Sequence, residues 1–174
     1  AITQIVGMVA GIIVARLAGP GVMGMVAYGT SYVSLLGFIN GIFGSAHIKL
    51  VSEGREHSEC MGVFTRLQGI CALIYFIAVL ALFLVRKYLL HYPFESKELE
   101  LIIIIALLTH TFELYGQYAN VVFTANLQQA KANLPQFFKT IIFHIGRILI
   151  VIFCVKNLAL KLYSWNLILA ILFI

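Results

Sequence analysis

The sequence has little charge for its length, and this scarcity excludes an ordinary soluble domain. Asp, Glu, Lys and Arg make up 11% of the 174 residues, hydrophobic residues make up 61%, and the mean hydropathy is +0.99. Soluble domains carry about 25% charged residues. Because lipid leaves backbone polar groups no partners outside helices and closed barrels, we expect an all-α, polytopic transmembrane helix bundle.

Cysteine is also scarce, and the three present do not form a recognisable site. Cys60, Cys71 and Cys154 are far apart, without a C-x-x-C pair and without a histidine at ligand spacing. We therefore expect neither a disulfide framework nor a zinc site, and no cofactor is indicated. The net charge of +5 falls mostly between the apolar runs, where it suits anionic lipid headgroups better than nucleic acid.

Long apolar runs predict five full membrane spans and the start of a sixth, in a single membrane domain over residues 1–174. A spanning helix needs roughly 20 mainly apolar residues. No basic region with a cleavage site precedes the first run, so we expect this run to be a span and not a signal peptide. Because the chain begins without Met and stops inside an apolar run, we expect the N-terminal part of a longer protein. The predicted spans are Ile2–Ala18, Val22–Ala46, Leu67–Val85, Leu101–Thr124 and Lys139–Val155, with the sixth opening near Trp165.

Glycine and proline indicate one turn and two helix contacts. The segment Ala18–Gly21, with the sequence AGPG, removes a backbone donor and permits positive φ, so it predicts a tight hairpin after the first span. The spacings Gly7-x-x-x-Gly11 and Gly37-x-x-x-Gly41 predict ridges where another helix can approach closely.

Hydrophilic segments between the apolar runs predict loops. Lysine and arginine are nearly balanced between the two sides of the bundle, so charge does not decide its orientation. Tyr163 and Trp165 are expected as interfacial aromatics at the start of the last span. The predicted loops are His47–Arg66, Tyr88–Glu100 and Ala125–Phe138.

The Leu101–Thr124 run carries a polar stripe along one side of its helix. Exposing Glu113 to lipid would cost several kcal/mol, so the stripe should face other helices or a watery cavity. It either lines a pathway for substrate or ions, or holds helices together through hydrogen bonds. At 100° per residue the stripe spans an arc of about 80° and contains His110, Glu113, Gln117, Asn120 and Thr124.

A second polar face runs along the Lys139–Val155 span. Arg147 lies too deep in the span to reach an interface, so it should also face protein or water. Antiparallel packing against the preceding span would place Glu113 and Arg147 at one depth, where an ion pair is geometrically available. The residues of this face are Gln136, Thr140, His144 and Arg147.

The first third of the chain contains a series of short motifs: a turn, several small residues and a polar end to the second helix. These are Ala15-Arg16-Leu17-Ala18-Gly19-Pro20, then Gly24, Tyr28, the segment Ser31–Ser34, Gly44 and Leu50-Val51-Ser52-Glu53. The pattern resembles the opening two helices of the oligosaccharide flippases of the polysaccharide transporter family, whose superfamily also holds multidrug and toxin extruders. Gly21-Val22 departs from it, since an acidic or polar residue often follows the turn.

The resemblance implies about half of a two-lobed alternating-access transporter in the cytoplasmic membrane, with its N-terminus in the cytoplasm. The implied activity is not enzymatic: it moves a polyprenyl-diphosphate-linked oligosaccharide to the outer leaflet for surface-polysaccharide synthesis, with membrane lipids and a coupling proton or sodium ion as further partners. A diphosphate and sugar hydroxyls need cationic and hydrogen-bonding groups inside the membrane. Polarity, and not a family motif, gives the candidate pathway residues Arg16, His110, Glu113, Gln117, Asn120, His144 and Arg147.

Two other classes of protein stay open at this point. A drug/cation antiporter of the same superfamily would bind cations with membrane carboxylates, yet Glu113 is single in the spans and the sequence has no Asp. A membrane polysaccharide polymerase or acyltransferase would need a catalytic constellation in a large loop, and none of the predicted loops is large.

Overall fold

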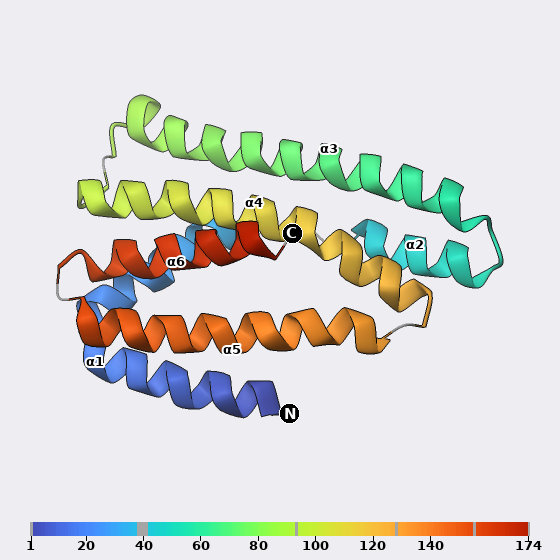
Figure 1. Cartoon of the computed structure of the whole chain (residues 1–174). Coiled ribbons are helices and arrows are strands. Elements are labelled where there is room, and N and C mark those ends of the chain that lie inside the picture. Colours follow the sequence, from blue (N-terminus) through green and yellow to red (C-terminus); the bar gives the residue numbers. More distant parts are fainter. Residues whose placement is uncertain (1, 38–41, 93, 128, 155, 174) are drawn as a thin grey trace.

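The structure, a computed structural model, is built of helices packed side by side (Figure 1). It describes residues 2–37, 42–92, 94–127, 129–154 and 156–173, with the side chains of all of these but 2, 42, 43, 57, 117–119, 129 and 132. No strand occurs within these ranges, which confirms the all-α fold class. The helices are α1 (Ile2–Ser34), α2 (Ile42–Ser52), α3 (His57–Leu84), the π-helix η2 (Val85–Leu89), α4 (Lys97–Ala125), α5 (Gln129–Phe153) and α6 (Leu158–Leu172).

Much of the outer surface of the bundle is apolar. Ile5 on α1, Ile77 on α3 and Ile152 on α5 are 61%, 56% and 56% exposed, values that suit contact with lipid and not with water. α6 is a shorter apolar helix. By length and composition the chain is a multi-pass membrane protein, because four described stretches can cross a membrane: Thr3–Ser34, Ser58–Leu89, Lys97–Ala125 and Asn133–Phe153.

Helix α1 reverses direction at Gly19. This residue has φ 80° and ψ 166°, a conformation that is essentially restricted to glycine. Pro20 then opens the second segment, where its missing N–H removes no helical hydrogen bond. In Figure 1 the two segments run in opposite directions. The predicted hairpin after Ile2–Ala18 is therefore confirmed.

The predicted span Val22–Ala46 is wrong as a single helix. α1 ends at Ser34, a turn follows, and α2 begins at Ile42, while residues 38–41 lie outside the described part of the chain. The apolar pattern gives no sign of this break because hydrophobic residues continue through it. Glycine at Gly37 favours the break, since glycine lowers helix stability by about 1 kcal/mol relative to alanine.

Two predicted loops are largely helical. The end of α2 and the start of α3 both lie within His47–Arg66, and α5 covers most of Ala125–Phe138. Pro135 lies inside α5, less than two turns from its start, where it removes a single backbone hydrogen bond. The polar sequence predicts a loop in both places, but a helix can continue beyond the bilayer into water. The loop predicted at Tyr88–Glu100 is also shorter than expected, since helix covers both of its ends.

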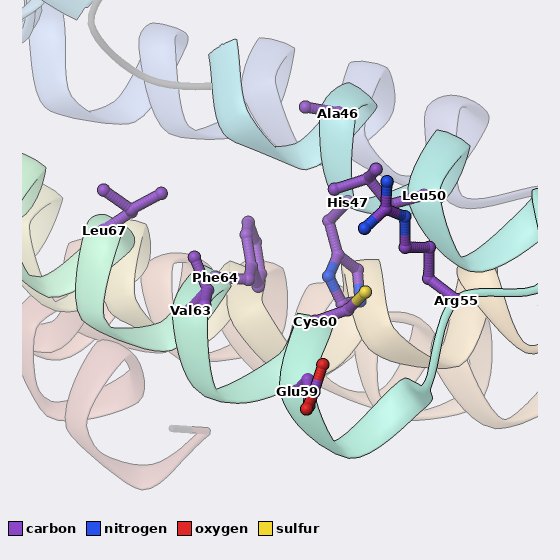
Figure 2. A pocket seen from close by; sticks show the side chains of 9 residues that line it. All are labelled: Ala46, His47, Leu50, Arg55, Glu59, Cys60, Val63, Phe64 and Leu67. Atoms are coloured by element: carbon purple, nitrogen blue, oxygen red, sulfur yellow. The ribbon is translucent and has the colours of Figure 1, made fainter.

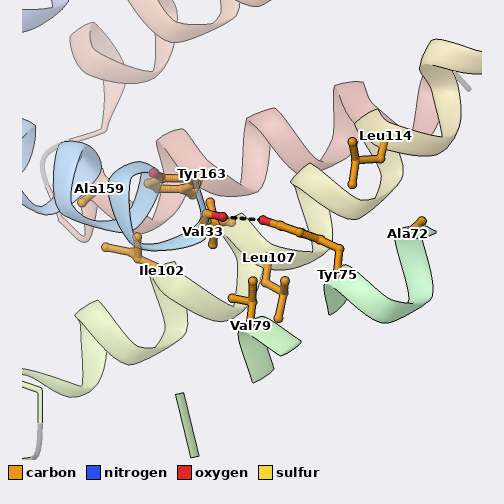
Figure 3. Packing of buried hydrophobic residues seen from close by; sticks show 10 residues of the cluster. Val33, Ala72, Tyr75, Val79, Ile102, Leu107, Leu114, Ala159 and Tyr163 are labelled. Carbon is orange, nitrogen blue, oxygen red and sulfur yellow. Dashed lines mark hydrogen bonds between the residues drawn. The ribbon is translucent and has the colours of Figure 1, made fainter. Parts of the chain in front are cut away.

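Helix α4 is the centre of the bundle and contacts each of the other α-helices. Ile102 and Leu114 of α4 are buried together with Tyr75 of α3 (Figure 3). The Tyr75 hydroxyl donates a hydrogen bond to the Val33 carbonyl at 2.6 Å and so links α3 to α1. Lipid provides no hydrophobic driving force between helices, so close packing and such hydrogen bonds stabilise the bundle.

Among the glycines with described surroundings, the closest approach joins α5 to α6. A Cβ added to Gly146 would lie 2.2 Å from the ring of Trp165, and the indole Nε1 donates to the Phe143 carbonyl at 3.2 Å. Tyr163 is buried and donates to the Val26 carbonyl of α1 at 2.7 Å. Tyr163 and Trp165 thus contact neighbouring helices, and their expected place at the membrane interface stays a prediction.

The predicted glycine ridges are confirmed at one position. A Cβ at Gly7 would lie 3.1 Å from His144 of α5, so α1 and α5 are close there. Gly11 and Gly37 face open space, with nothing within 4 Å of an added Cβ, and the close contacts predicted for them are wrong. Gly41 lies outside the described residues. A small-residue spacing allows a close contact but does not supply the partner helix.

Candidate functional site

A polar cavity lies between α1, α4, α5 and α6, and it brings together three of the seven predicted pathway residues. We call it the central cavity; its volume is about 340 Å³. His110 and Glu113 reach it from α4, and Arg147 reaches it from α5. The remaining lining residues are Val26, Thr30, Val33, Ser34, Ala106, Thr109, Phe143, Tyr163 and Asn166.

Arg147 is the cation of the central cavity. Its side chain is half-buried, and the guanidinium lies 5.1 Å from the centre of the Phe143 ring, a cation–π contact. Its Nε is buried and has no hydrogen-bond partner among the described residues. A buried donor left unpaired is costly, so Arg147 is suited to an acceptor that enters the cavity.

Asn166 on α6 lines the same cavity and has an acceptor atom that lacks a partner among the described residues. Its Oδ1 is buried and, like the Nε of Arg147, has no hydrogen-bond partner among the described residues. Asn166 is not among the residues predicted from the sequence, because the predicted last span begins only near Trp165 and is too short to show which side of its helix is polar. The signal available was a single amide within an otherwise apolar run.

The hydroxyl groups of Tyr163 and Thr30 meet at the wall of the cavity. Their oxygens are 2.5 Å apart, and the Tyr163 hydroxyl also lies 2.7 Å from the Val26 carbonyl, to which it donates. The Thr30 hydroxyl lies 3.0 Å from the same carbonyl, and its single hydrogen is donated either to that carbonyl or to the Tyr163 oxygen. These bonds tie α6 to α1. Thr30 was visible in the sequence as part of a polar segment, but not as a neighbour of Tyr163.

Glu113 pairs with a different cation from the predicted one. Between described side chains, its Oε1 lies 3.4 Å from the Nζ of Lys139, and it forms no ion pair with Arg147. Lys139 and Arg147 are eight positions apart on α5, which is about 12 Å along the helix. The predicted Glu113–Arg147 pair is therefore wrong, although both residues line the central cavity.

The Glu113–Lys139 pair joins the central cavity to a smaller recess. This recess has a volume of about 200 Å³ and contains Glu113, Lys139 and Gln136 among its lining residues. Glu113 belongs to both spaces, so its carboxylate stands between them. The exposed fractions of the Lys139 and Glu113 side chains are 21% and 41%, which leaves the pair accessible to water or ions.

The two predicted pathway histidines, His110 and His144, have different surroundings. His110 lines the cavity and packs its ring 5.2 Å from that of Tyr75. His144 contacts α1 at Gly7 and is not among the lining residues of the central cavity. Helical periodicity puts His144 and Arg147 on one face of α5. It does not predict that His144 lies against α1 while Arg147 lines the central cavity.

Besides His144, three other predicted pathway residues are not placed in the cavity. Arg16 is exposed on the first segment of α1, and Asn120 is half-buried on α4; neither lines the cavity. The side chain of Gln117 lies outside the described residues. Arg16 does not line the cavity because the hairpin at Gly19 places the end of the first segment at the edge of the bundle.

A second recess, the α2–α3 hollow, has the opposite construction (Figure 2). Its volume is about 230 Å³, and Leu50, Val63 and Phe64 give it an apolar wall. Arg55 and Glu59 are exposed at its rim. Arg55 and Glu59 are therefore solvated and need no ligand, while the buried His47 ring stacks on Phe64 with the ring centres 4.7 Å apart.

The central cavity can bind an anion and hydrogen-bonding groups inside a membrane bundle. Arg147 supplies the cation, Asn166 an acceptor, and Tyr163 a hydroxyl. In the described part of the chain, no group of three or more His, Cys, Asp or Glu residues is arranged to hold a metal ion. The chain matches no protein-family model, no curated protein and no solved structure.

Proposed function

We propose that the chain forms part of a flippase that moves a polyprenyl-diphosphate-linked oligosaccharide across the cytoplasmic membrane for surface-polysaccharide synthesis. In this proposal it contributes about half of a two-lobed alternating-access transporter, with the N-terminus in the cytoplasm. The observation that supports it best is Arg147, a half-buried cation with an unpaired donor, facing a cavity between membrane helices. Such a residue is costly in a membrane unless it serves a ligand or pathway.

The chemistry of the substrate matches the chemistry of the cavity. A diphosphate accepts paired hydrogen bonds from a guanidinium, which Arg147 can donate. Sugar hydroxyls donate and accept, and Asn166 has an acceptor without a partner among the described residues. The prenyl tail can remain in lipid beside the apolar outer faces of α3 and α5. The resemblance of residues 12–54 to oligosaccharide flippases agrees with this assignment.

The alternatives receive less support from the same geometry. A drug/cation antiporter needs a carboxylate that is free to bind a cation, and Glu113 already has Lys139 at 3.4 Å. In the flippase, that ion pair is the group that a coupling proton would break, because protonation removes the carboxylate charge. The helix bounds leave short connections, which do not favour a polymerase or acyltransferase.

Transport in proteoliposomes tests the proposal. The protein carrying this chain is reconstituted with a polyprenyl-diphosphate-linked sugar bearing a fluorophore, and flipping is measured as loss of fluorescence to an external quencher. Arg147→Gln should slow flipping roughly tenfold or more, since hydrogen bonds to a charged group contribute about 1.5–3 kcal/mol. Arg147→Lys should retain part of the rate because it keeps the charge without the planar fork.

Arg55→Gln is the matched control, because Arg55 lies at the rim of the α2–α3 hollow. Its flipping rate should equal that of the wild-type protein. If Arg147→Gln flips the lipid as fast as Arg55→Gln does, the central cavity is not the route of the diphosphate. If the wild-type protein does not accelerate flipping, the proposed function is wrong.

A further inference from the structure

Among the described side chains that line the central cavity, one buried donor and one buried acceptor lack a hydrogen-bond partner. The Nε of Arg147 and the Oδ1 of Asn166 are buried, and neither has a hydrogen-bond partner among the described residues. They come from α5 and α6 and line the same cavity. Buried polar atoms are nearly always paired, so each of these two requires an explanation. Their requirements are opposite, because one must meet an acceptor and the other a donor.

A diphosphate explains the first atom and not the second. Its oxygens accept hydrogen bonds and so suit Arg147, but they repel the carbonyl oxygen of Asn166. The Tyr163 hydroxyl, one helical turn from Asn166, does not meet this need, since it donates to Val26 and contacts Thr30. Asn166 therefore requires a ligand group with a hydrogen to donate, such as a hydroxyl or an amide N–H.

We propose that Asn166 is a specificity-determining residue that binds the sugar attached to the diphosphate. This inference rests on the proposed function, because it takes Arg147 as the group that binds the phosphate. A sugar joined to a phosphate carries hydroxyl groups next to the anion, and Asn166 lines the same cavity as Arg147. The cavity, at about 340 Å³, is many times larger than the space that one water molecule needs. The site thus distinguishes a loaded lipid from a bare prenyl diphosphate.

Binding to two probes tests this inference. The first probe is a short-chain prenyl diphosphate, and the second is the same lipid with one hexose on its terminal phosphate. The wild-type protein, purified in detergent, should bind the glycosylated probe about fivefold more tightly, the ratio expected for one neutral hydrogen bond. Asn166→Leu should abolish this preference while leaving the affinity for the bare diphosphate within about twofold.

Asn120→Leu is the matched control, because Asn120 is a half-buried amide on α4 that does not line the cavity. It should keep the fivefold preference. A series of deoxy-hexose probes with the wild-type protein needs no variant: removal of one hydroxyl should cost the whole preference, and removal of the others little.

The outcomes separate this inference from the proposed function. Equal binding of the two probes by the wild-type protein, a preference that survives Asn166→Leu, or a flat deoxy series would each overturn the role of Asn166. In all three cases, weaker binding of both probes to Arg147→Gln would still support the proposed function. If neither probe binds the wild-type protein, or Arg147→Gln changes nothing, the proposed function fails and this inference fails with it.

Discussion

The central cavity and the α2–α3 hollow are recesses of comparable size, about 340 and 230 Å³, yet their charged groups are placed differently. In the cavity Arg147 and Asn166 bury polar atoms that lack partners among the described residues. In the hollow Arg55 and Glu59 are exposed at the rim of an apolar wall. The placement of polar atoms, more than the size of a recess, distinguishes a binding site from a gap in packing.

The two recesses also differ in how the chain forms them. The hollow lies between α2 and α3, which follow each other in sequence. The cavity is enclosed by α1 at one end of the sequence and α6 at the other, together with α4 and α5. Its geometry depends on long-range contacts, such as the bonds of Tyr163 to α1 and the contact of Gly146 with Trp165. Changes to these contacts should affect the cavity and spare the hollow.

The largest effect is expected at the α5–α6 contact. Gly146→Leu should destabilise the protein by about 3 kcal/mol, because the new side chain would enter the Trp165 ring, 2.2 Å from the Cβ position. Gly62→Leu, next to Val63 of the hollow, should be neutral or slightly stabilising, since nothing lies within 4 Å of its Cβ. Thermal unfolding in detergent measures both variants. Equal destabilisation of the two would mean that the close contact is not formed.

Protection from a thiol reagent should differ between the two recesses. Ser34→Cys places a thiol at an exposed lining position of the central cavity, and the native Cys60 lines the hollow. With Cys71 and Cys154 replaced by Ala, a prenyl diphosphate at about ten times its Kd should slow labelling at Ser34→Cys about tenfold and leave Cys60 unaffected. Protection at Cys60 and not at position 34 would move the anion site to the hollow.

The ion pair at the edge of the cavity should show a smaller effect. Glu113→Gln and Lys139→Gln should each lower stability, and the double variant should recover part of the loss, with a coupling of about 1 kcal/mol. The matching cycle of Glu113→Gln with Arg147→Gln should give a coupling near zero. Denaturant unfolding of the two sets of variants measures these energies. A larger coupling to Arg147 would restore the pairing expected from sequence.

The smallest effect is expected for a single hydroxyl. Tyr163→Phe should destabilise the protein by about 1 kcal/mol, because it removes the hydrogen bond to the Val26 carbonyl and a partner of Thr30. Tyr92→Phe is the control, since Tyr92 is 70% exposed and its loss should change stability by less than about 0.5 kcal/mol. Indistinguishable unfolding midpoints for the two variants would mean that this hydrogen bond does not stabilise the wall of the cavity.

Several features of this protein follow from local sequence alone. The composition alone predicts an all-helical membrane chain, because lipid leaves few other ways to satisfy the hydrogen bonds of the backbone. The AGPG segment is sufficient for the reversal at Gly19, since the required φ suits glycine. The period of 3.6 residues is sufficient to put His110 and Glu113 on one face of α4. All of these are properties of a residue and its near neighbours.

The tertiary structure decided which partners those faces meet. Periodicity says which side of its own helix a residue occupies, but the rotation and sliding of one helix against another are set by packing along their whole lengths. Lys139 is therefore the partner of Glu113, while the Nε of Arg147, about 12 Å further along α5, has no partner among the described residues. Asn166 joins the cavity for the same reason, because the contact of Trp165 with Gly146 fixes how α6 lies against α5.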